Sequence, residues 1–193
     1  MKPADLTPIL LRCSALALLV GGVGWGLSGL LRGWLGGEAL GLTADQMGAL
    51  ALPFLTLLIL GAPGLYFGLR TGRSYLLGGG VALTEAGLLL ALIGTASAYG
   101  LTGQGGDPGG QTLIGIGTVV IGAGALVMSL GLIRQGGSAD WIAVLLAALG
   151  LTVIPALLEP RFAILPGLCW AALGFVVWLA AGEIEAAAKT RPR

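Results

Sequence analysis

Residues 75–99 read YLLGGGVALTEAGLLLALIGTASAY, a long apolar run that contains a single ionisable side chain, Glu85. A helix rises about 1.5 Å per residue, so this run is long enough to cross a hydrocarbon core about 30 Å thick. Glu85 then lies about 15 Å from Tyr75, close to the middle of the membrane. The stretch predicts a transmembrane helix with a carboxyl group at mid-depth.

The composition extends this interpretation to the whole chain. Of its 193 residues 10% are charged and 56% are apolar before the 36 glycines are added, whereas a soluble domain is about 25% charged. Histidine is absent, which excludes histidine-ligated haem or zinc and a histidine-activated serine or cysteine nucleophile. We therefore expect no cofactor, no metal site and no enzyme activity, and no basic stripe suggests nucleic acid.

The apolar runs predict an all-α fold, a polytopic α-helical membrane protein with six transmembrane helices in a single domain, residues 1–193. The predicted spans cover about residues 13–31, 47–69, 75–98, 112–133, 141–158 and 162–181, and residues 182–193 form a short polar cytoplasmic tail. No signal-peptide cleavage site follows the first apolar run, so we expect this segment to remain in the protein as the first span. The two cysteines, Cys13 and Cys169, fall toward opposite membrane faces and are expected to be free.

The orientation follows from the basic residues near the ends of the spans. With the N-terminus inside, two of the ten lie outside, Arg32 and Arg161. The other eight lie on the cytoplasmic side: Lys2, Arg12, Arg70, Arg73, Arg134, Lys189, Arg191 and Arg193. The count predicts that both termini are cytoplasmic. The Gly-, Ala- and Leu-rich composition, with more Arg than Lys, suggests a GC-rich genome. We expect a prokaryotic protein of the inner (plasma) membrane.

The second span carries two prolines, Pro53 and Pro63. Each removes a backbone hydrogen bond, so this helix is expected to be bent or locally broken. Just before it, Thr43 and Gln46 have the spacing of a capping box, in which their side chains bond to the first free amides of the helix.

Glu85 is the main candidate for chemistry. Placing a charged carboxylate at mid-membrane costs a few kcal/mol of free energy. The Glu85 side chain is therefore expected to be protonated, to face a water-filled cavity or to bind a cation. Hydrogen-bonding side chains expected at similar depth are the adjacent Thr84, Thr56, Thr152 and the indole of Trp170, which could instead line a solute pocket. Glu85 either binds a proton, a small cation or the amine of a solute during transport, or it is a protonated residue that links helices.

Glycine spacing is the second pattern. Gly22 and Gly26, and likewise Gly64 and Gly68, are four residues apart, which lets helices approach closely, either inside the bundle or in a homodimer. Displacing the third span by 37 residues onto the fourth aligns glycines and leucines. This could be a duplication or a chance result of the composition. The matches pair Leu76, Gly78, Gly80, Gly87, Leu89 and Gly94 with Leu113, Gly115, Gly117, Gly124, Leu126 and Gly131.

Three classes of function remain open. A small-solute or ion transporter, or the membrane-embedded subunit of one, predicts a cavity that reaches Glu85 from one face. A non-catalytic accessory or assembly subunit predicts a solid core and an apolar flank. A membrane enzyme acting on lipid or quinone needs a polar cluster at one interface. The expected partners are the lipid bilayer and either other membrane subunits or further copies of the chain.

Overall fold

The computed structural model describes residues 3–34, 41–69, 75–100, 107–135 and 140–190. Within these ranges the chain is helical and forms no strand. The elements are α1 (Pro3–Trp34), α2 (Ala44–Ala49), α3 (Ala51–Gly61), α4 (Pro63–Leu69), α5 (Tyr75–Thr95), the π-helical turn η2 (Ala96–Gly100), α6 (Pro108–Gln135), α7 (Asp140–Leu158), the 3-10 turn η3 (Pro160–Ala163) and α8 (Ile164–Thr190).

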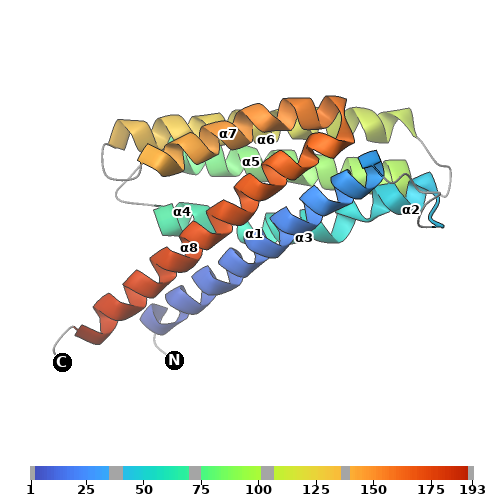
Figure 1. Ribbon diagram of the computed structural model, residues 1–193. Helices are drawn as coiled ribbons and strands as arrows, with labels where there is room; N and C mark the ends of the chain where they lie inside the picture. Colours follow the sequence, from blue (N-terminus) through green and yellow to red (C-terminus); the bar gives the residue numbers. More distant parts are fainter. Residues whose placement is uncertain (1–2, 35–40, 70–74, 101–106, 136–139, 191–193) are drawn as a thin grey trace.

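The prediction of six apolar helices is confirmed. Six helices are long and apolar enough to cross a membrane: Thr7–Trp34, Asp45–Leu69, Tyr75–Tyr99, Pro108–Gln135, Trp141–Leu158 and Pro160–Ala187. The start of α1 and the end of α8 lie together at one end of the bundle, called here the terminal end (Figure 1). The opposite end of the bundle contains the last turn of α1 together with α2, η2 and η3 (Figure 1). Five of the basic residues that predict the orientation fall outside the described residues, namely Lys2, Arg70, Arg73, Arg191 and Arg193.

Helix α1 begins ten residues before the predicted span and continues through Pro8. One proline near a helix start removes a single hydrogen bond, so the helix tolerates it. Near the terminal end, Arg12 donates to Glu185 of α8 at 2.6 Å and lies 5.4 Å from the ring centre of Trp178. Arg12 and Arg32 are about 30 Å apart along this helix, the thickness of a hydrocarbon core, and no charge lies between them.

The second span is interrupted as predicted. It consists of α2, α3 and α4, and the breaks fall at Leu50 and Ala62. Pro63 has no N–H for the helix, so the regular pattern stops at the residue before it. The predicted capping box is also confirmed, because Gln46 N donates to Thr43 Oγ1 at 3.2 Å and Thr43 N donates to Gln46 Oε1 at 2.9 Å.

Helices α5 and α6 are antiparallel and touch backbone to backbone. Their contact contains glycines seven residues apart, namely Gly80, Gly87 and Gly94 on α5 and Gly110, Gly117, Gly124 and Gly131 on α6. A β-carbon at Gly87 would lie 2.7 Å from the carbonyl oxygen of Gly117, and one at Gly117 would lie 2.6 Å from that of Gly87. Only glycine fits there. We call this row of contacts the α5–α6 seam.

The α5–α6 seam explains the sequence matches at a displacement of 37. The three glycine pairs in which both members belong to the seam are Gly80 with Gly117, Gly87 with Gly124, and Gly94 with Gly131. Each of the two helices needs a glycine at every seventh position to pack this closely. Packing therefore accounts for these matches without a duplication.

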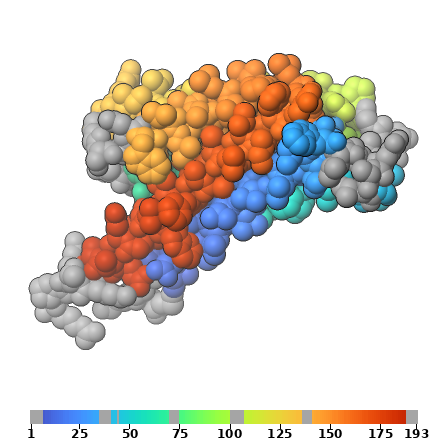
Figure 2. All heavy atoms as spheres, in the orientation of Figure 1, coloured from blue at the N-terminus to red at the C-terminus, as the bar shows by residue number. Residues whose placement is uncertain are grey.

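Two further pairs of helices pack in the same way. Gly22 of α1 and Gly167 of α8 approach so closely that a β-carbon on either would lie 2.7 Å from the carbonyl oxygen of the other. Figure 2 shows α1 and α8 side by side across one face of the molecule. Gly122 of α6 and Gly150 of α7 make the same mutual contact at 2.9 Å. Helix α6 thus has one seam with α5 and another with α7.

The α5–α6 seam generates a stability prediction with an internal control. Gly87→Ala should lower the free energy of unfolding by about 1–3 kcal/mol, because the new methyl group meets backbone that cannot move aside. Gly79→Ala, on the same helix, meets nothing within 4 Å and should leave stability unchanged or slightly higher. Thermal unfolding of the purified protein measures both. Equal effects of the two substitutions would contradict the seam.

Candidate functional site

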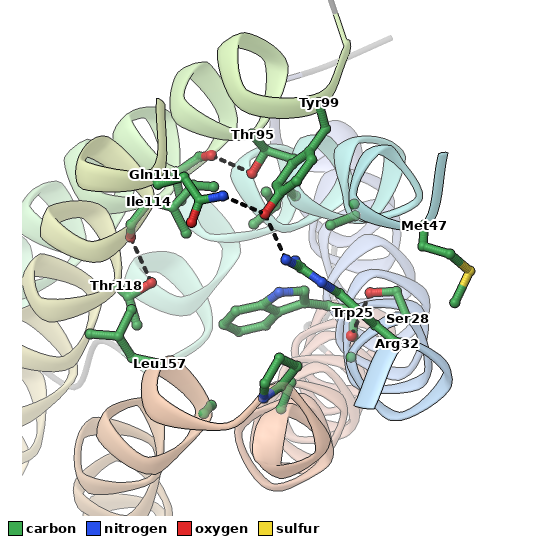
Figure 3. A pocket seen from close by; sticks show the side chains of 18 residues that line it. Trp25, Ser28, Arg32, Met47, Thr95, Tyr99, Gln111, Ile114, Thr118 and Leu157 are labelled. Atoms are coloured by element: carbon green, nitrogen blue, oxygen red, sulfur yellow. Dashed lines mark hydrogen bonds between the residues drawn. The ribbon is translucent and has the colours of Figure 1, made fainter. Parts of the chain in front are cut away.

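A cavity of about 200 Å³ lies at the opposite end of the bundle, among α1, the second span, α5, η2, α6, α7 and η3 (Figure 3). Its described lining residues are Trp25, Ser28, Gly29, Arg32, Met47, Gly48, Ala51, Leu55, Ala91, Thr95, Tyr99, Gln111, Ile114, Thr118, Ala156, Leu157, Pro160 and Ala163. None of these carries a negative charge, and one, Arg32, carries a positive charge.

Tyr99 is the centre of the polar contacts. Its hydroxyl accepts a hydrogen bond from Arg32 Nη2 at 2.6 Å and another from Gln111 Nε2 at 3.2 Å. The Arg32 guanidinium also lies 4.9 Å from the centre of the Tyr99 ring, within cation–π distance. Tyr99 belongs to η2, and π-helical turns of this kind are frequent at functional sites. The three side chains come from three elements and converge at the cavity (Figure 3).

The smaller hydroxyls of the cavity bond to their own helices. Ser28 Oγ donates to the carbonyl oxygen of Trp25 at 2.8 Å. Thr95 Oγ1 donates to that of Ala91 at 2.7 Å, and Thr118 Oγ1 to that of Ile114 at 2.8 Å. Their protons are therefore used, and the hydrogen-bond donors left for a ligand come from Arg32, Tyr99, Gln111 and the Trp25 indole.

The cavity has an exposed rim and a buried floor. Arg32 and Gln111 are exposed, whereas Leu55 and Ala91 are 2% and 3% exposed. From Tyr99 to Ala91 the cavity follows α5 for about 12 Å into the bundle. Beyond it the core is closed by side chains that are fully buried, namely Leu18, Leu58, Leu88, Ile121, Leu149 and Trp170. The cavity thus enters the bundle from one end and does not continue through it.

Glu85 lies on α5 about 9 Å beyond Ala91, farther from the opposite end, and it is not among the described lining residues. Its side chain is half-buried. In the described ranges it forms no ion pair, and no hydrogen bond to it is found. Helix α5 packs mainly on α6 and on the second span. The cavity at the opposite end therefore does not reach Glu85.

The other four candidates are not gathered around Glu85. Thr84 is fully buried in the α5–α6 seam against Gly124, and its hydroxyl has no hydrogen-bond partner. Thr56 is exposed and donates to Leu52 of its own helix at 2.9 Å.

Thr152 and Trp170 belong to α7 and α8, which pack against other helices than α5. Thr152 donates to the carbonyl oxygen of Ala148 at 2.7 Å and also contacts Cys169, which is free like Cys13. Trp170 is completely buried, and its indole nitrogen has no hydrogen-bond partner.

The four glycines selected from the sequence lie at helix contacts. Gly22 and Gly26 face α8, Gly64 meets Ser14 of α1, and Gly68 lies at ordinary contact distance from Val177 of α8. All four contacts lie within one chain.

The sequence analysis does not identify Arg32, Tyr99 and Gln111 as site residues, and it uses Arg32 only in the charge count. Their common position was a usable signal. In the six-span topology Arg32 ends the first span, Tyr99 ends the third and Gln111 precedes the fourth, so all three fall at the same end of the bundle.

The helices define a multi-pass helical membrane protein with a largely apolar cavity at one end that carries a polar cluster at Tyr99. Within the described ranges no three Cys, Asp or Glu side chains come together to hold a metal ion. The chain matches no known protein family, no curated protein and no solved structure.

Proposed function

We propose that this protein binds a small solute in the cavity at the opposite end and acts as a transporter or as the membrane-embedded subunit of one. The observation that carries the proposal is a cavity at one end of the bundle in which polar side chains from three elements meet at Tyr99. A volume of about 200 Å³ is below the roughly 300–1,000 Å³ of sites for drug-sized ligands. The solute is therefore small.

Binding is better supported than catalysis. Among the described lining residues Ser28 is the one serine, and its proton is bonded to a backbone carbonyl. No histidine exists in the chain to activate it, and the described lining contains no carboxylate or cysteine. A membrane enzyme acting on lipid or quinone is the least supported of the three classes.

The closed core favours a second candidate, an accessory or assembly subunit of a larger membrane complex. The fully buried side chains between the cavity and the terminal end leave no continuous passage in the described part of the chain. A transporter would have to open this packing during its cycle, whereas a subunit that only binds solute would not.

We further propose that both termini are cytoplasmic, so that the cavity opens to the outside of the inner membrane. The support is the excess of Lys and Arg at the terminal end. A solute arriving from outside would then meet Arg32 and Gln111 first.

The orientation has a direct test. In a background without Cys13 and Cys169, Trp34→Cys should react with a membrane-impermeant thiol reagent in intact cells, because Trp34 is 72% exposed at the opposite end. Tyr75→Cys, 89% exposed at the terminal end, should react only after the cells are opened. The reverse pattern would place the cavity on the cytoplasmic side.

Glu85 is proposed to take up and release a proton as the solute site changes its accessibility. Solute retention or uptake should depend on pH in the wild type, and Glu85→Gln should remove that dependence. The free energy of unfolding of this variant should stay within about 1 kcal/mol of the wild-type value. Glu183→Gln, an exposed position on α8, is the control. Loss of stability with unchanged pH dependence would instead identify Glu85 as a link between helices.

Solute binding itself can be tested without knowing the ligand. Ser28→Trp should fill the cavity, and small molecules that co-purify with the wild type should be absent from the variant when both are extracted and analysed by mass spectrometry. Leu27→Trp, the next position on α1 and 46% exposed on the outer surface, is the matched control and should retain them. Identical extracts from both variants would refute binding in this cavity.

A further inference from the structure

We infer that the cavity recognises a small organic anion, whose acidic group binds at Arg32 and Tyr99. This inference rests on the proposed function and adds the chemical class of the solute to it.

The charge of the cavity is the first argument. The two ion pairs in the described part of the chain are Arg12 with Glu185 and Arg161 with Glu159, so Arg32 has no carboxylate partner there. It lies in the last turn of α1 with its guanidinium turned toward Tyr99 (Figure 3). A cation held at a cavity whose described lining contains no acidic residue attracts an anion.

The hydrogen-bond inventory is the second argument. A guanidinium has five N–H donors, and among the described residues Arg32 uses one of them, for Tyr99. The Tyr99 hydroxyl accepts from both Arg32 and Gln111, and within the same ranges no acceptor takes its own proton. The free donors of Arg32 and Tyr99 lie together, and a carboxylate or phosphate oxygen is a group that only accepts.

The rest of the cavity suits a ligand whose remaining part, beyond the acidic group, is apolar. Trp25 extends its ring into the cavity (Figure 3), and Met47, Leu55 and Ala91 line the buried part. Arg32 and Gln111 at the rim would hold the acidic end, and the aromatic and aliphatic side chains would contact the remainder.

The test compares benzoate with benzamide, two probes of nearly the same shape that differ in charge. Calorimetric titration of the wild type in phosphatidylcholine nanodiscs should show tighter binding of benzoate. Arg32→Gln should weaken benzoate binding by about tenfold to a hundredfold, the range for loss of a hydrogen bond between charged groups. It should leave benzamide binding within about twofold.

Two further variants separate charge from a change in the fold. Arg32→Lys keeps the positive charge without the guanidinium fork and should recover part of the benzoate affinity. Arg161→Gln removes a cation at the same end of the bundle that is paired with Glu159 at 3.1 Å, and it should leave both affinities unchanged.

The source of the acidic group is tested by repeating the titrations with phosphatidylglycerol in the nanodiscs. If an anionic headgroup occupies the site, benzoate binding weakens in the wild type but not in Arg32→Gln. If the native ligand is a soluble anion, the lipid has no effect. Both results support recognition of an anion.

The inference is overturned if benzoate binds no better than benzamide, if Arg32→Gln weakens both equally, or if neither binds to the wild type. The proposed function is judged separately by the solutes lost in Ser28→Trp. An uncharged solute that is lost from that variant would leave the function standing and refute the anion.

Discussion

Close contact between antiparallel helices is the constraint on which this structure depends. Within lipid there is little hydrophobic gain from bringing apolar helices together, so association relies on van der Waals contact and on the approach of backbone to backbone. The chain meets this requirement with glycine at every seventh position. At Gly87 and Gly117, and again at Gly22 and Gly167, the carbonyl oxygen of one helix occupies the place where a side chain would otherwise stand.

The cavity lies where this regular packing ends. The short helix α2, the π-helical turn η2 and the 3-10 turn η3 all lie at the opposite end, around the cavity. Irregular backbone in a membrane is tolerated where it is buried in protein or lines an aqueous space. Polar side chains such as Tyr99 and Gln111 find hydrogen-bond partners at this end. Close packing therefore accounts for the solid core below the cavity.

Much of the fold could be predicted from the sequence, because length and apolar composition determine which segments can cross a bilayer. The break at Pro63 and the cap formed by Thr43 and Gln46 were also predictable, since both are local backbone effects. The relative arrangement of the helices was not. Glu85 attracted attention because one charge in an apolar run is conspicuous, whereas the contact between Arg32 and Tyr99 joins residues 67 positions apart. Assembling that site required the tertiary structure.

The two seams of α6 limit how its length can change in evolution. Its contact with α5 contains Gly117 and Gly124, and its contact with α7 contains Gly122. An insertion of one residue in the middle of α6 would rotate everything beyond it by about 100° and turn the α6 glycines beyond it away from their partners. An insertion of seven residues would return the residues beyond it to the same face of the helix. Descendants of this chain should therefore lengthen or shorten α6 in steps of seven.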